Sequence, residues 1–88
     1  MAKNTTGNPW VCDAVEVITT QHVRVHTFRW VSKTASAGDD LLVVDNNGDT
    51  ILASVATGAN YVEAHDIGAR FCGINITAID SGKLYIYV

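Results

Sequence analysis

The sequence predicts a small all-β domain, an antiparallel β-sandwich or barrel with a flexible N-terminal arm. Two turn signals, Asn47-Gly48 and Ser81-Gly82, each lie between apolar segments of strand length. Apolar and polar residues alternate within several segments, and no apolar pattern of helical period is sustained. A chain of 88 residues has room for one domain, which we expect at 9–88.

The arm is predicted at 1–8, where the sequence MAKNTTGN is polar, contains glycine and lacks periodicity. Pro9 and Trp10 mark the point where the chain enters the domain. The segments 11–19 and 21–32 then alternate as strands. In the second of them the phase switches at Phe28, which indicates a bulge near Thr27 or a strand that changes sheets.

A hairpin is predicted at 41–55, with Asn47-Gly48 in a type I′ turn because both residue types tolerate positive φ. The implied cross-strand pairs are Leu41–Ser54, Leu42–Ala53, Val43–Leu52 and Val44–Ile51. Both faces of this hairpin are apolar near its middle. We therefore expect a hairpin that is covered on both faces within the domain, or one that is covered by the core on one face and by a neighbour on the other.

A second hairpin is predicted at 74–88, with Ser81-Gly82 as its turn. Alternation places Leu84, Ile86 and Val88 toward the core, and Tyr85 and Tyr87 on the opposite face. The stretch 56–69 is expected to be mostly connection, with a short strand at 61–62.

The charge and composition of the chain argue against some classes of function and favour others. The net charge is −3 and the six basic residues are scattered singly, which argues against a nucleic-acid partner. No apolar run approaches the ~20 residues that span a bilayer, and the N-terminus has no secretory apolar core, so we expect synthesis in a cytoplasm. Hydrophobic residues make up 48% and charged residues 17% of the chain. So apolar a composition indicates either very efficient packing or contact of apolar surface with another protein, and we expect the second.

The spacing of the candidate catalytic and metal-binding residues does not favour catalysis or metal binding. His22 and His26 lie about 13 Å apart if they are on a strand, too far to share one ion. His65-Asp66 resembles an oriented base, but no motif places a nucleophile near it. We expect no enzyme activity and no cofactor.

The acidic residues Asp39, Asp40, Asp45 and Asp49 lack the spacing of a calcium loop, and turn chemistry explains Asp45 and Asp49. Cys12 and Cys72 are expected to be two free, buried thiols in a reducing cytoplasm; a disulfide between them is the alternative.

The stretches GNPWV, FRWVSKTASAGDDLLVVDNNGDTILASVATGANYVE and DSGKLYIYV together resemble small virion proteins of tailed bacteriophages. The resemblance covers nearly the whole chain and consists of turn and strand features. It implies a structural virion component, a capsid decoration (cement) protein on the outside of the head. The implied partners are the phage major capsid protein and further copies of the chain, as a trimer or dimer. The implied location is the virion, after synthesis in the bacterial cytoplasm.

Under this hypothesis the arm orders on the capsid and apolar faces pack between subunits. The candidate partner-binding residues are Lys3, Asn4, Thr5, Thr6, Asn8, Trp10, Tyr85 and Tyr87. The alternative is a tail-associated ligand- or receptor-binding module, in which Trp10, Trp30 or Tyr61 would form an exposed aromatic platform.

Overall fold

A computed structural model describes residues 3–88, and within them the chain forms seven strands and no helix. The all-β prediction is confirmed. The strands are β1 (Lys3–Asn4), β2 (Trp10–Cys12), β3 (Glu16–Ser32), β4 (Asp40–Val44), β5 (Thr50–Val55), β6 (Tyr61–Ile79) and β7 (Lys83–Tyr87). They form one antiparallel sheet in the order β1-β2-β7-β3-β6-β4-β5.

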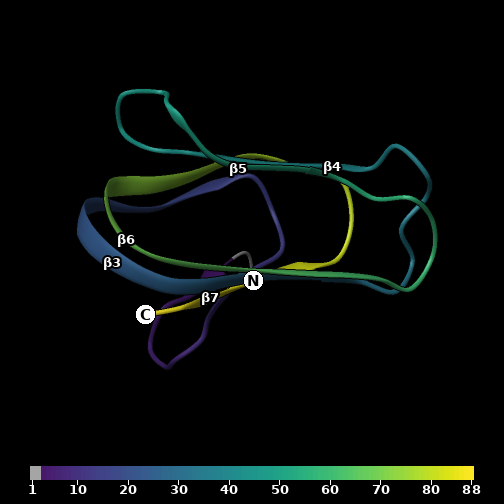
Figure 1. Cartoon of the computed structure of the whole chain (residues 1–88), viewed down its shortest axis with the longest axis horizontal. Helices are drawn as coiled ribbons and strands as arrows, with labels where there is room; N and C mark the ends of the chain where they lie inside the picture. Colours follow the sequence, from purple (N-terminus) through teal and green to yellow (C-terminus); the bar gives the residue numbers. More distant parts are fainter. Residues whose placement is uncertain (1–2) are drawn as a thin grey trace.

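The sheet folds over on itself into two layers, with β4 and β5 in one and β7 in the other (Figure 1). The long strands β3 and β6 run through both layers and bend together where they pass between them (Figure 1). The end strands β1 and β5 do not pair with each other, so the sheet is not closed. Of the two predicted architectures, the layered one is present and the barrel is not.

The length of β3 and β6 differs from the prediction of short strands. The strand expected at 61–62 extends over 19 residues, to Ile79. Three register shifts in the β3–β6 pair accommodate the bend. One lies between Val25 and Thr27, where the sequence predicts a bulge, and it allows both Val25 and Phe28 to be fully buried.

The β4–β5 hairpin confirms the pairs Leu41–Ser54, Leu42–Ala53 and Val43–Leu52, but Val44 pairs with Thr50 instead of Ile51. The predicted type I′ turn is wrong, because Gly48 has φ +81° while Asn47 is not in the positive-φ region. Gly48 donates its N–H to the carbonyl of Asp45, and Asp45 donates its own to Asp49. This is a three-residue loop with glycine at its left-handed position.

The hairpin predicted at 74–88 is wrong, since β7 pairs with β3 and β2 and not with β6. Residues 80–82 instead carry the chain from one layer to the other (Figure 1). Polar side chains hold this crossing in place. Trp30 donates its indole N–H to the Ser81 carbonyl at 2.9 Å, Ser32 donates to the Ser81 hydroxyl at 2.7 Å, and Ser81 donates to Asp39 at 2.8 Å.

The core fills the space between the layers. As predicted, Leu84 and Ile86 point into it and are fully buried, although the next alternate residue, Val88, is 41% exposed. The strand expected over 11–19 is interrupted at 13–15, and Val15 is also exposed. The largest buried side chains are Trp30, Phe28, Leu41, Ile74, Ile76, Leu84 and Ile86.

Candidate functional site

The outer face of the β7 layer carries both candidate tyrosines. Tyr85 lies opposite Arg29 and Tyr87 opposite Thr27 on β3, and both tyrosines are half-buried. Val31 lies opposite Lys83 on one side and Val62, which is 56% exposed, on the other. We call this surface the basic face; its members are Arg29, Val31, Val62, Lys83, Tyr85 and Tyr87. The prediction that Tyr85 and Tyr87 point away from the core is confirmed.

The outer face of the β4–β5 layer is the second apolar surface. Leu42 lies opposite Ala53 and Ala78, and Asp40 lies opposite Val55, which is 54% exposed. These residues line a shallow groove of about 390 Å³. We call this surface the acidic face; its members are Asp40, Leu42, Ala53, Val55, Ala78 and Asp80. Both sides of the hairpin are therefore apolar, as the sequence predicts, and the chain covers only the inner one.

The predicted arm lies against the domain within the described residues. Lys3 and Asn4 pair with Val11 and Cys12 of β2, and Met1 and Ala2 lie outside the described residues. Residues 5–8, with the candidates Thr5 and Thr6, are exposed.

Asn8 fixes the end of this segment to the C-terminal residue. Its side chain donates to the Val88 carbonyl and accepts from the Val88 N–H, both at 3.0 Å. Trp10, on β2, is half-buried and packs against the core. The eight candidate residues are thus in two places. Residues 3–10 include six of them, with Trp10 on β2, and the outer face of β7 holds the two tyrosines.

The aromatic platform of the alternative hypothesis is not present at Trp30. Its side chain is 1% exposed, and Tyr61 packs edge-on against it with ring centroids 5.4 Å apart. The expectation of an exposed Trp30 is wrong, because the phase switch in β3 turns this residue inward.

The three histidines lie apart from one another, two on β3 and one on β6. His22 and His26 are both exposed on β3. His65 and Asp66 point apart, since Asp66 accepts a hydrogen bond from Thr27 at 2.8 Å. Among the described residues, no group of three or more His, Cys, Asp or Glu side chains could hold a metal ion.

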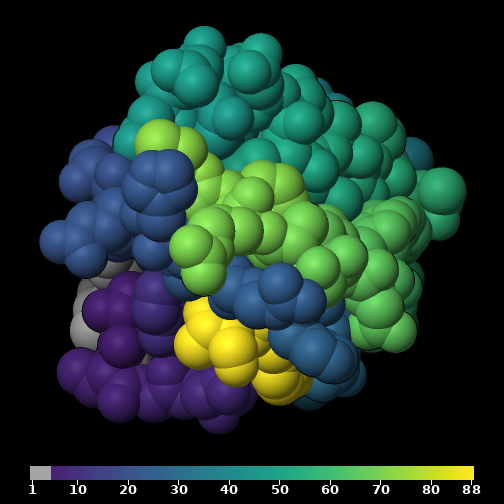
Figure 2. Space-filling view, turned by 60° about the vertical axis from the view of Figure 1, so that its left-hand side comes forward, coloured from purple at the N-terminus to yellow at the C-terminus, as the bar shows by residue number. Residues whose placement is uncertain are grey.

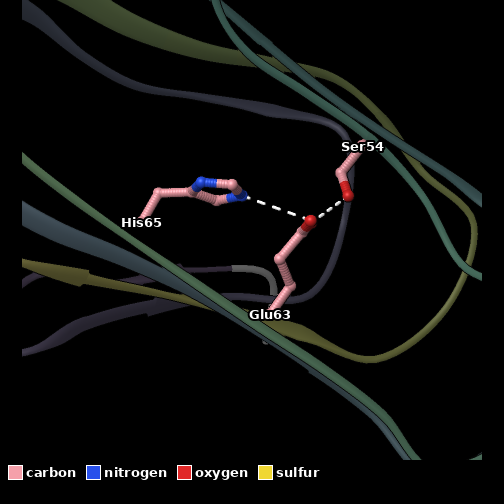
Figure 3. A network of polar contacts seen from close by, with 3 residues as sticks. All are labelled: Ser54, Glu63 and His65. Atoms are coloured by element: carbon pink, nitrogen blue, oxygen red, sulfur yellow. Dashed lines mark hydrogen bonds and ion pairs between the residues drawn. The ribbon is translucent and has the colours of Figure 1, made fainter.

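His65 instead contacts Glu63, a contact that the sequence reading missed. Its Nε2 lies 3.3 Å from Oε1 of Glu63, and Ser54 donates a hydrogen bond to the other carboxylate oxygen (Figure 3). The carboxylate sits between the hydroxyl and the imidazole, so the histidine is not placed to take the serine proton. Ser54 belongs to β5, whereas Glu63 and His65 belong to β6. The three side chains therefore tie the edge strand of one layer to the other layer.

Asp45 and Asp39 accept hydrogen bonds within turns, as predicted for Asp45. Its Oδ1 accepts the N–H groups of Asn47 at 2.9 Å and Asp49 at 3.0 Å. Asp39 accepts the Ser36 N–H at 3.0 Å and the Ser81 hydroxyl at 2.8 Å. Both donors favour the charged carboxylate and lower the pKa of Asp39 below its usual 3.8.

Cys12 and Cys72 are not joined in a disulfide, so that alternative is not realised. Cys12 is buried and Cys72 is half-buried near the bend of β6. Among residues 3–88, no helix has the length and apolar character to cross a membrane. The sequence matches no family model, and no curated protein or solved structure is detectably similar to it.

Proposed function

We propose that this chain is a structural virion protein, a capsid decoration subunit that binds the major capsid protein on the outside of a tailed-phage head. The resemblance of the sequence to small phage virion proteins motivates the proposal. The observation that carries it is the N-terminal segment, a short strand at the end of the sheet followed by four exposed residues. In this role the protein bridges shell subunits and stabilises the head.

Attachment through β1 follows from its position. Within residues 3–88, β1 pairs with β2 alone, so one edge of Lys3–Asn4 has unpaired backbone groups. An extended segment of the shell can add to such an edge by main-chain hydrogen bonds. Thr5 and Thr6 supply hydroxyl groups beside it. Each contact is small, but many copies on one head make weak single contacts effective.

The structure sharpens the deletion that tests this role. Removing all of 1–8 would also remove Asn8, which holds Val88 through two hydrogen bonds. We therefore choose deletion of 1–6, which removes β1 and the two threonines and keeps the contact between Asn8 and Val88. Asn8→Ala is the matched control, because the side chain of Asn8 is bonded to Val88 and is not counted here as a contact with the shell; the change breaks the bond to Val88 and leaves β1 in the chain.

The assay is co-sedimentation with purified heads that lack decoration protein, prepared from a phage whose genome encodes this chain. We expect the full chain and Asn8→Ala to sediment with the heads, and the deletion variant to remain in the supernatant with an unchanged circular dichroism spectrum. Undiminished binding by the deletion variant would refute attachment through the N-terminal segment. Failure of the full chain to bind heads would refute the decoration role itself.

A further inference from the structure

We propose that copies of this chain associate head to tail, with the acidic face of one copy bound to the basic face of the next. The two surfaces lie on opposite layers of the same domain. Figure 2 shows the β4–β5 region in teal at one side of the molecule and β7 in yellow at the other. This inference does not rest on the virion role, because the association concerns the protein alone.

The apolar parts of the two faces are complementary, since one is a groove and the other carries two aromatic side chains. The acidic face is a groove lined by Leu42, Ala53, Val55 and Ala78, with no large side chain filling it. The basic face presents Tyr85 and Tyr87, whose rings bury a large apolar area and carry a polar end. Aromatic side chains seated in an apolar groove are typical of the centre of a protein interface.

The charges around these surfaces are opposite in sign. Asp40 lines the groove, and Asp80 lies beside Asp40, whose N–H its carboxylate accepts at 2.7 Å. The stretch 34–69, which includes all of β4 and β5, contains no lysine or arginine. Arg29 and Lys83 lie on the basic face, and Lys33 lines a hollow beside Lys83 and Tyr85. Asp66 is an acidic residue at the far end of this face, where Thr27 donates to it.

The charged residues of the two faces form no ion pair with the side chains that the structure describes. Among the side chains that the structure describes, the one ion pair is His65–Glu63, which belongs to neither face. Two acidic faces brought together would repel each other, as would two basic faces. Charge complementarity therefore selects the contact between unlike faces.

The positions of the two faces determine the form of the assembly. Because the two faces are on opposite layers, each added copy leaves one face open. The copies thus form an open row, in contrast to the dimer or trimer expected from the sequence resemblance.

Sedimentation velocity of the purified full chain over a range of concentrations tests this association. We expect an average mass that rises past that of a dimer, and a weaker association when salt is raised from about 50 to about 500 mM, because salt screens exposed charges. A chain that remains monomeric at every soluble concentration would overturn the proposal.

Charge reversals identify the faces. Asp40→Lys and Lys83→Glu are each expected to weaken association about tenfold or more. A mixture of the two variants should associate, because each supplies the intact face that the other lacks. Asp49→Lys and Arg24→Glu change the net charge equally at exposed positions on neither face, and they should associate like the unmodified chain. A contact between two like faces would leave one of the two face variants unaffected, and that result would also overturn the proposal.

Discussion

Gly82 is a position at which a single added methyl group should be costly, because the neighbouring atoms belong to β3. It has φ +75°, and a Cβ added there would lie 2.3 Å from the Val31 carbonyl oxygen and 2.5 Å from Cβ of Ser32. Neither neighbour can move easily, since both belong to the fixed part of β3. Gly48 has a similar φ of +81°, but an added Cβ there meets nothing within 4 Å. Alanine substitutions at the two glycines therefore separate two free-energy costs, that of a left-handed backbone conformation and that of steric overlap with β3.

Gly48→Ala should reduce the free energy of unfolding by about 1–2 kcal/mol, the cost of a left-handed conformation for alanine. Gly82→Ala carries the same conformational cost, and forced overlap adds about 1–3 kcal/mol. Urea unfolding followed by tryptophan fluorescence measures both, because Trp30 is buried and its indole contacts Ser81. Equal losses for the two variants would show that residues 80–82 do not pack on β3 as described.

Two further predictions concern the aspartates. Asp45→Ala should lower the free energy of unfolding by about 1 kcal/mol through loss of the two N–H contacts in the β4–β5 loop, while Asp45→Asn retains an acceptor and should lose less in the same urea assay. Asp39 has a lowered pKa when folded, so its contribution to stability is present above pH 3.8 and disappears as the pH falls through the folded value. The stability advantage over Asp39→Asn should shrink over that acid range; an advantage that does not depend on pH would contradict the assigned hydrogen bonds.

The sequence was sufficient for features that depend on neighbours along the chain. Alternation and local turn chemistry predict the β4–β5 register from Leu41 to Val43, the phase switch between Val25 and Phe28, and the inward direction of Leu84 and Ile86. The type of the β4–β5 turn could not be predicted as easily, because Asp45 stabilises a loop one residue longer through its own carboxylate.

Pairing between distant segments could not be predicted. Ser81-Gly82 has the composition of a hairpin turn, yet the chain crosses between layers there because Trp30, Ser32 and Asp39 bind Ser81. Those three residues are far from it in the sequence. The same holds for Glu63, whose contacts with Ser54 and His65 arise only when β5 and β6 lie in facing layers.

The residues of the two outer faces could be predicted only in part from the sequence. Alternation placed Tyr85 and Tyr87 together and showed that the 41–55 hairpin is apolar on both sides. That Arg29 flanks the tyrosines, and that Asp80 lies beside Asp40, depends on which strands are neighbours in the sheet.

The two long strands β3 and β6 also determine how the domain unfolds. Because β3 and β6 each supply backbone hydrogen bonds to both layers, neither layer contains a complete set of its own strands. Opening one layer by pulling its strands away would disrupt the other at the bend. The domain should therefore unfold as a single cooperative unit, with slowly exchanging amides in β3 and β6 that lose their protection together.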